Sequence, residues 1–241
     1  MFDALQQKGF TVLTLHHAEA ILTHDLPETV DELTGALDDI SIPVEELVRG
    51  GGGETKFTQR LRKTLTDQGW NKHNFVIKET IDGNPTQSLS HEVDHVRRVE
   101  KGVVALELEW NNKDPFFDRD LENFSRLHGK GAISVGMIIT RGRSLHDSLE
   151  DKMEAFARKA RITGPKALKK YYTPTPRQIG LMKRRAEIVG SFEKAWASIF
   201  VSDKFGEATT HWRKLTERVD RGVGNPCPLV LVGLPDTIVK P

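Results

Sequence analysis

Two consecutive β-strand candidates lie in residues 91–110, which read His91-Glu92-Val93-Asp94-His95-Val96-Arg97-Arg98-Val99-Glu100-Lys101-Gly102-Val103-Val104-Ala105-Leu106-Glu107-Leu108-Glu109-Trp110. Residues 103–110 are apolar except for two glutamates. Because side chains alternate between the two faces of a strand, Glu107 and Glu109 share one face, and Leu106, Leu108 and Trp110 share the other. The stretch therefore predicts a β-hairpin whose second strand carries two adjacent anions among hydrophobic residues.

The turn of this hairpin determines which residues face each other. If residues 100 and 101 form a two-residue turn, Asp94 lies opposite Glu107 and Glu92 lies opposite Glu109. A four-residue loop gives the same register, whereas a three-residue loop would shift it by one residue. The sequence thus predicts a cluster of carboxylates on two neighbouring strands.

Such a cluster needs a partner that compensates its charge. Like charges directly opposed destabilise a sheet, and desolvation adds to the cost, so the carboxylates require a cation or a shared proton. Mg²⁺ binds carboxylate oxygens together with water and substrate phosphate oxygens. The cluster therefore points to a Mg²⁺ site and to phosphodiester hydrolysis. The alternative is an exposed antiparallel edge with solvated acids, although the Val, Ala and Leu neighbours indicate that both faces are partly covered.

A second motif overlaps the first strand. Residues 91–95 also satisfy His-Glu-x-x-His, the signature of zinc peptidases, in which a helix brings both histidines to one face. The β-branched residues Val93, Val96 and Val99 favour a strand instead. A helix at 89–100 would support a zinc metallopeptidase that uses His91 and His95, and a strand there supports the magnesium hairpin.

Cysteine content and hydropathy indicate the cellular compartment. A chain of 241 residues with one cysteine, Cys227, has no internal disulfide framework. Its N-terminus lacks the basic and apolar regions of a signal peptide, and no apolar run approaches the roughly 20 residues that a membrane helix needs. We expect a cytoplasmic protein with no membrane partner and enough chain to bury a sizeable core.

Charge is distributed unevenly along the chain. The formal net charge of +1 alone would argue against a nucleic-acid partner. Residues 1–50, however, hold ten acidic and two basic residues, and residues 151–190 hold eleven basic and three acidic ones, which gives formal charges of −8 and +8. A basic segment of this strength favours a polyanionic partner, while a solvated helical face is the alternative.

Periodicity and breakers predict the order of the elements. Strands are expected at 10–15, 75–81, 91–99, 102–110, 132–140 and 229–234, and helices at 27–36, 54–68, 115–128, 147–160, 176–200 and 206–221. Strands alternating with helices predict an α/β fold. The glycines at 50–53 are not followed by the Gly-Lys-Ser/Thr of a phosphate loop, so a hinge is expected there.

Asp94, followed by Glu107-Leu108-Glu109, resembles the active-site motif of the PD-(D/E)XK nucleases, and the neighbouring segments resemble the BglII/BstYI type of type II restriction endonuclease. The similar pieces are residues 68–70, 107–116, 136–142 and 225–233. The resemblance implies a PD-(D/E)XK nuclease-like core at about 54–145 and 205–235, with a central mixed β-sheet flanked by helices. The whole chain, 1–241, would be a single endonuclease domain with a helical N-terminal part at 1–50 and a basic helical insert at about 150–204.

The same resemblance implies an activity and its residues. It implies Mg²⁺-dependent cleavage of both strands of a short palindromic DNA site by a homodimer, in a restriction-modification system with a cognate DNA methyltransferase. The residues matching Asp94 and Glu107 would hold the metal, and Glu109 would help to bind it and to orient the attacking water. Val93 replaces the family's usual proline, and Glu109 stands where a lysine is usual, which excludes a lysine general base. Glu79 or Glu92 is the candidate for a further acidic ligand.

Polar residues next to the predicted strand ends are candidate DNA contacts. Amides can read adenine, and basic side chains can reach guanine or a phosphate. We therefore expect contacts from Asn111, Asn112, Lys113, Arg141, Arg143, Ser144, Thr209, Thr210 and His211. A helix-capping turn at 111–115 and an N-cap at Thr209 are the alternatives. The basic segment 158–185 is expected to contact the DNA backbone. A non-catalytic DNA-binding protein is the third interpretation, beside the nuclease and the zinc peptidase.

Overall fold

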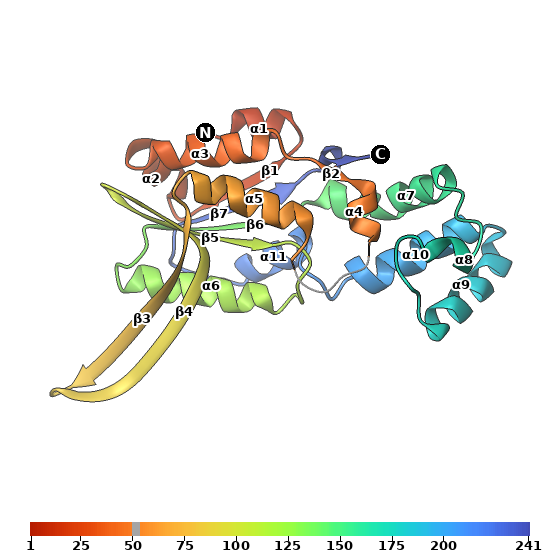
Figure 1. Cartoon of the computed structure of the whole chain (residues 1–241). Helices are drawn as coiled ribbons and strands as arrows, with labels where there is room; N and C mark the ends of the chain where they lie inside the picture. The colour runs from red at the N-terminus through yellow and green to blue at the C-terminus, as the bar shows by residue number, and fades with distance from the viewer. Residues whose placement is uncertain (50–53) are drawn as a thin grey trace.

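A six-stranded mixed sheet forms the centre of the computed structural model (Figure 1), which describes residues 1–49 and 54–241. The hinge expected at the four glycines lies outside these residues. Strands β5, β6 and β7 run parallel to one another, and the other neighbours pair antiparallel. In spatial order the strands are β1 (Thr11–Leu15), β7 (Leu229–Leu234), β6 (Val135–Arg141), β5 (Gly102–Glu109), β4 (Asn84–Val99) and β3 (Asn71–Ile81). The predicted α/β class with a central mixed sheet is confirmed.

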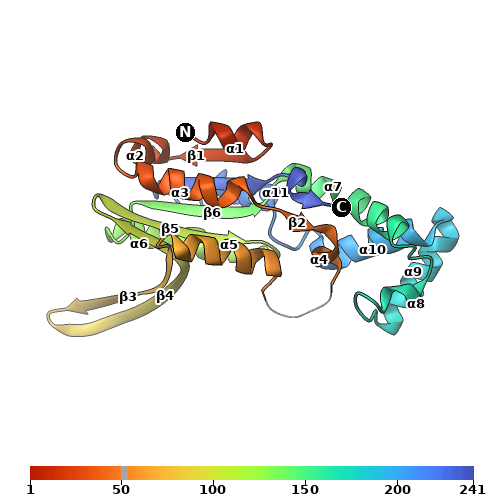
Figure 2. The ribbon, with the colours of Figure 1, turned by 45° about the horizontal axis from the view of Figure 1, so that its top comes forward.

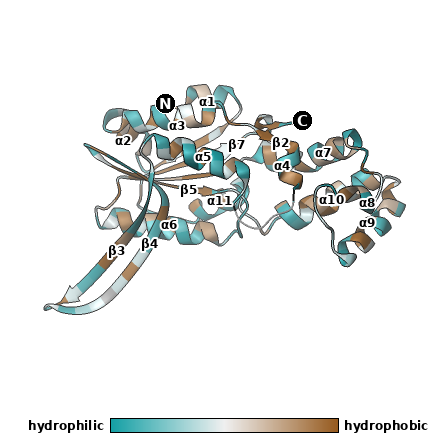
Figure 3. Ribbon diagram, in the orientation of Figure 1, coloured by the Kyte–Doolittle hydropathy of each residue, from teal (hydrophilic) through white to brown (hydrophobic). Residues whose placement is uncertain are grey.

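Helices cover both faces of the sheet (Figure 2), as the prediction of a flanked sheet requires. One hydrophobic cluster joins the sheet to α1 (Asp3–Gln7), α2 (Ala18–His24), α3 (Pro27–Asp38), α4 (Val44–Val48) and α5 (Lys56–Asp67). The other joins it to α6 (Phe116–Gly129) and α11 (Trp212–Val219). Helix α5 buries Phe57, Leu61 and Leu65, and its outer surface is largely hydrophilic (Figure 3). None of the helices in the described ranges is long and apolar enough to cross a membrane.

The chain between β6 and α11, which contains the basic helical insert, folds as helices beside the sheet. These helices are α7 (Arg143–Lys159), α8 (Pro165–Leu168), α9 (Pro176–Val189) and α10 (Phe192–Phe205). The prediction of one continuous helix at 176–200 is wrong. Gly190 ends α9 in the left-handed conformation, with φ of +72°, and the Ser191 hydroxyl caps α10 by accepting a hydrogen bond from the Lys194 amide at 3.3 Å. A short second sheet pairs β2 (Ile42–Pro43) with β8 (Val239–Lys240), which follows a 3₁₀ turn at Asp236–Ile238.

Strands β3 and β4 extend past the sheet as a two-stranded arm (Figure 1). Strand β4 pairs with β5 only from His95 to Val99, but it pairs with β3 along nearly all of its length. At the base of the arm, His73 pairs with Val93 while Asn71 pairs with Val96, so β4 contains one extra residue there. This β-bulge at residues 94–95 changes which face the later side chains of β4 point to, and it bends the arm away from β5.

Candidate active site

The two glutamates of β5 are buried against α6. Glu107 and Glu109 are each 3% exposed, whereas Leu106 and Trp110 on the other face join the larger hydrophobic cluster. The turn at residues 100–101 gives the predicted hairpin register, which the pairing of His95 with Leu106 confirms. Beyond that pair, the Asp94 amide donates to Oε2 of Glu107 at 3.4 Å. The structure therefore places the Asp94 backbone next to Glu107 at the point where β4 leaves β5, while the half-exposed Asp94 carboxylate lies 3.7 Å from Lys72 Nζ.

Neither of the two upstream acids joins this cluster. Glu92 was predicted to lie opposite Glu109, but past the bulge β4 follows β3, so Glu92 pairs with Asn74 and its exposed carboxylate binds Lys72 Nζ at 2.7 Å. Glu79 lies farther out on the arm, and its carboxylate binds Lys130 Nζ at 2.7 Å. The expectation that one of them supplies a further ligand is therefore wrong for this geometry.

The further acid is Asp120, from helix α6. Its side chain is fully buried, Arg119 donates to its Oδ1, and its Oδ2 has no hydrogen-bond partner among the described residues. The sequence did contain a signal for it. Asp120 lies three residues after Phe117 and four before Phe124, on the apolar stripe of an amphipathic helix, where an acidic residue is unexpected.

Burial and mutual repulsion raise the pKa values of these carboxyls. Burial raises the pKa of Glu107 well above 4.5, and the charges of Asp120, Asp94 and Glu109 raise it further. Burial and then Asp120 raise the pKa of Glu109 to about 8, against a hydrogen bond donated by Asn112 Nδ2 at 2.9 Å. Burial also raises the pKa of Asp120, although the Arg119 guanidinium opposes the rise. Burial thus disfavours the charged forms of these carboxyls unless a cation neutralises them.

A histidine completes this group. Nε2 of His91 lies 3.8 Å from Oε1 of Glu107, and ligand atoms of His91, Glu107 and Asp120 all lie within 4.8 Å of one another. The three side chains come from β4, β5 and α6. Because both histidine nitrogens and carboxylate oxygens bind metals, this arrangement can hold a metal ion.

The zinc-peptidase interpretation is wrong, because residues 91–95 lie in a strand. Strand β4 covers Asn84–Val99, so no helix brings the two histidines together. The bulge also sends them to opposite faces of the sheet, since His91 contacts Glu107 while His95 pairs with Leu106 and lines a cleft beside Arg62. A single zinc ion cannot bind both.

A second group of potential ligands, His146, Glu207 and His211, does not fit a metal ion. The two imidazole rings are stacked, with centroids 4.0 Å apart and planes 10° apart. Their in-plane lone pairs therefore lie in separate parallel planes and cannot both point to one ion about 2.1 Å from each nitrogen. In addition, Glu207 forms an ion pair with Arg213. We interpret this group as packing between α7 and the segment before α11.

Two of the segments predicted to contact DNA lie side by side. Lys113 and Thr209 form an antiparallel bridge. The backbone amide of Thr210 donates to the backbone carbonyl of Asn112 at 2.8 Å, and the backbone amide of Asn112 donates to Thr210 Oγ1 at 3.1 Å. This pairing explains why α11 starts at Trp212 rather than at the predicted residue 206. Asn112 and Lys113 are exposed, so two candidate contacts project beside Glu109 at the end of β5.

Three predicted DNA contacts are buried instead. Thr210 and His211 are 0% and 1% exposed, and His211 stacks on His146. Arg141 is also 0% exposed, and it donates to the carbonyls of Trp110, Thr210 and Phe205 at 3.1, 2.7 and 3.3 Å. Burial lowers its pKa to about 9, so it remains charged at neutral pH. Arg141 ties the end of β5 to the segment after α10 and cannot read bases in this structure.

Replacing Arg141 with methionine should lower the free energy of unfolding by about 2–3 kcal/mol, because several buried carbonyl groups lose their donor. Thermal and urea denaturation would measure the loss. Arg143→Met is the matched control, since Arg143 is exposed and its ion pair in the described part of the chain is a surface pair with Asp147. Equal stability of the two variants would contradict the structural role of Arg141.

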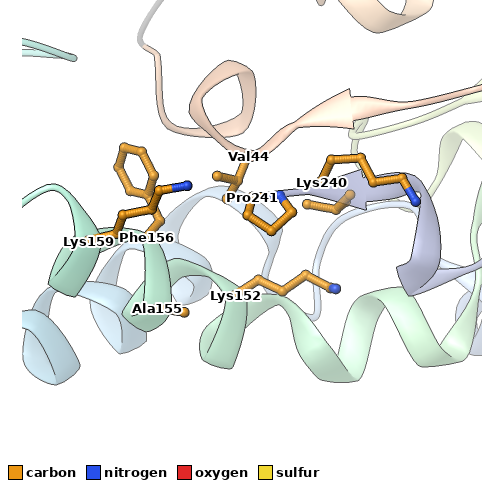
Figure 4. A pocket seen from close by; sticks show the side chains of 8 residues that line it. Val44, Lys152, Ala155, Phe156, Lys159, Lys240 and Pro241 are labelled. Atoms are coloured by element: carbon orange, nitrogen blue, oxygen red, sulfur yellow. The ribbon is translucent and has the colours of Figure 1, made fainter.

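The remaining candidates are accessible. Arg143 and Ser144 are exposed at the start of α7, although Ser144 Oγ accepts a hydrogen bond from the Asp236 amide at 3.2 Å. Asn111 and Thr209 are half-buried. Asn111 and Asn112 line a cleft of about 640 Å³ together with Asp94, His95, Leu108 and Trp110. A smaller apolar pocket between α4, α7 and the last residues of the chain (Figure 4) contains no residue of the carboxylate cluster.

The chain matches one family by sequence. The model of the family described as restriction endonuclease BglII/BglIII covers residues 10–234. This span includes all six strands of the main sheet and every carboxylate of the cluster. No curated protein matches the chain.

Proposed function

Because this chain belongs to the BglII/BglIII restriction endonuclease family, and is therefore a type II restriction endonuclease acting on the phosphodiester bonds of DNA, we propose that it uses Mg²⁺ to cut both strands of a short palindromic site. The observation that carries this proposal is the buried cluster of Glu107, Glu109 and Asp120 with the half-buried Asp94 next to it, in a protein of this family.

The residues of the cluster fit a divalent cation. A cation would relieve the burial and mutual repulsion that raise the pKa values of Glu107 and Glu109, and Oδ2 of Asp120 is a buried acceptor that no N–H donor of the described residues reaches. Asp94, Glu107 and Asp120 would hold the ion. When bound, Mg²⁺ would polarise the scissile phosphate and stabilise the charge that develops on the leaving oxygen.

Glu109 replaces the lysine that is usual in related nucleases, so its role is that of a carboxylate. Its Oε2 accepts from Asn112 Nδ2 at 2.9 Å, and Arg119 lies 3.8 Å from its Oε1. These contacts hold the carboxylate at the end of β5, where it would accept a hydrogen bond from the attacking water and orient it. Asn112 thus connects the catalytic strand to the turn that we expect to touch the bases.

We assign DNA recognition to the accessible candidates. A groove of the DNA would be entered by Asn111, Asn112 and Lys113, with Thr209 beside them. The flanking DNA backbone or bases would be contacted by Arg143 and Ser144. A palindromic site read by two-fold symmetry requires two copies of this surface, so the active form would be a homodimer. We further propose that residues 1–241 act as one cytoplasmic endonuclease domain. A cognate DNA methyltransferase would protect the genome of the host cell from it.

The basic insert is proposed to bind the phosphate backbone. Lys183, Arg184 and Arg185 are exposed on α9, and none of them has an ion-pair partner among the described residues. Replacing all three with alanine should weaken binding to every DNA sequence alike and reduce the slope of log K against log salt by about 2–3, since each phosphate contact contributes about 0.9. Fluorescence anisotropy with several duplexes tests this. Lys8→Ala is the control, because Lys8 is paired with Asp38 and lies outside the insert. An unchanged slope in the triple variant would exclude the insert from the DNA interface.

Plasmid cleavage tests the proposed function directly. The full chain is incubated with several plasmids of known sequence in the presence of Mg²⁺, with and without EDTA. Discrete fragments that disappear on chelation, with symmetric ends on sequencing, are the expected result. DNA binding without cleavage under any divalent metal would overturn the proposed catalysis and support a non-catalytic DNA-binding protein. Sedimentation of the protein with cut-site duplex tests the homodimer.

A further inference from the structure

His91 lies where a nitrogen ligand of the catalytic metal would lie. It precedes the bulge of β4, so its ring points to the same face of the sheet as Glu107, and its Nε2 is 3.8 Å from Oε1 of that glutamate. The ring is mostly buried, with 17% of the side chain exposed. Three consecutive elements, β4, β5 and α6, thus bring together one nitrogen and two carboxylates, from His91, Glu107 and Asp120.

The side-chain amide of Asn123 lies against this ring. It follows Asp120 by one turn of α6, and its Nδ2 lies 2.8 Å from Nδ1 and 3.1 Å from Nε2 of His91. An atom this close to both ring nitrogens lies over the face of the imidazole and not in its plane. Asn123 therefore fixes the ring by packing against it and does not occupy the in-plane lone pair of Nε2, through which a histidine binds a metal.

Asp120 supplies an independent indication of a ligand. Its carboxyl is fully buried, yet Oδ2 has no partner among the described residues and lies in the same group of ligand atoms. Adjacent ligands of an octahedral ion lie about 3 Å apart when each bond is about 2.1 Å long. The separations in this group, all under 4.8 Å, therefore need only a small inward movement of side chains to meet one ion.

We propose that His91 binds the catalytic metal through Nε2, positioned by Asn123, and that the mixed nitrogen and oxygen set makes this centre bind Co²⁺ more tightly than Mg²⁺. The inference rests on the proposed metal-dependent function and specifies its metal chemistry. Carboxylate and water ligands suit Mg²⁺, whereas imidazole favours the later divalent transition metals. The site would thus differ from one built from carboxylates alone.

Metal binding without DNA tests this inference separately from cleavage. Mn²⁺, Co²⁺ and Mg²⁺ are titrated by calorimetry into the full-length wild type, His91→Gln, Asn123→Ala and the control His73→Gln. His73 is an exposed histidine on the neighbouring strand β3. We expect His91→Gln to weaken Mn²⁺ and Co²⁺ binding at least about tenfold and Mg²⁺ binding less, and Asn123→Ala to weaken Mn²⁺ binding by about tenfold. His73→Gln should bind all three metals as the wild type does.

Pulsed electron paramagnetic resonance of bound Mn²⁺ gives a direct readout of the ligand. A nitrogen coupling in the wild type that is absent in His91→Gln supports the inference. A spectrum without nitrogen coupling, or equal Mn²⁺ affinity in wild type and His91→Gln, would overturn it even if the enzyme cuts DNA. Conversely, a nitrogen-coupled Mn²⁺ site in a protein that never cleaves DNA would refute the proposed function and leave the metal ligation standing.

Discussion

Replacing Glu107 with glutamine should reduce DNA cleavage at least about a thousandfold while leaving DNA binding within a few fold of the wild type. Glu107 lies at the centre of the carboxylate cluster, in contact with the Asp94 amide and near both Asp120 and His91. A neutral amide cannot supply the charge that a cation at this position needs, and a thousandfold loss corresponds to about 4 kcal/mol of transition-state stabilisation. Single-turnover cleavage of a labelled duplex and anisotropy in Ca²⁺ would measure the two quantities.

The substitution is suited to this test because the variant should fold. Burial raises the pKa of Glu107 well above 4.5 and so favours its neutral form in the metal-free protein, and a glutamine is neutral and has nearly the same shape. Glu92→Gln and Glu79→Gln are matched controls on the adjacent hairpin, since each side chain is exposed and paired with a lysine. If Glu107→Gln cuts at the wild-type rate, or if Glu92→Gln is equally inactive, the assignment of the active site is wrong.

The hairpin of β4 and β5 was predictable because its information is local. Alternation in residues 103–110 defined the two faces of β5, and the turn at 100–101 defined a register that the pairing of His95 with Leu106 bears out. The bulge at residues 94–95 was not predictable in this way. It depends on pairing with β3, whose partner residues lie some twenty positions upstream, and it moved Glu92 out of the cluster and separated His91 from His95.

Predictions failed where a side chain's surroundings come from distant segments. Arg141 follows a strand, a position typical of accessible functional residues, but residues 205–210 fold over it and supply carbonyl acceptors. Asp120 and His91 were missed because they reach the site from other elements. Asp120 could have been identified from its place on the apolar stripe of α6, whereas His91 carried no comparable signal outside the misleading zinc motif.

The metal-free protein should lose about 4–5 kcal/mol of stability between pH 5 and pH 8.5, a larger change than any surface substitution would cause. The pKa of Glu109 rises from 4.5 in the unfolded chain to about 8 in the fold, and those of Glu107 and Asp120 also rise. Over this range the folded chain retains protons that the unfolded chain has released, so the free energy of unfolding falls as pH rises. Thermal denaturation in EDTA should show the melting temperature dropping by roughly 10–15 °C.

Two comparisons identify the cluster as the cause. The double variant Glu107→Gln/Glu109→Gln carries no titrating carboxyl at these positions, so its melting temperature should depend much less on pH, whereas Glu79→Gln should follow the wild type. A saturating divalent metal should stabilise the wild type strongly at pH 8.5 and weakly at pH 5, because the ion competes with protons for the same carboxylates. An equal stabilisation by the metal at both pH values would mean that the ion binds elsewhere. Metal affinity rises with pH only where the ligands must lose protons before they bind the ion.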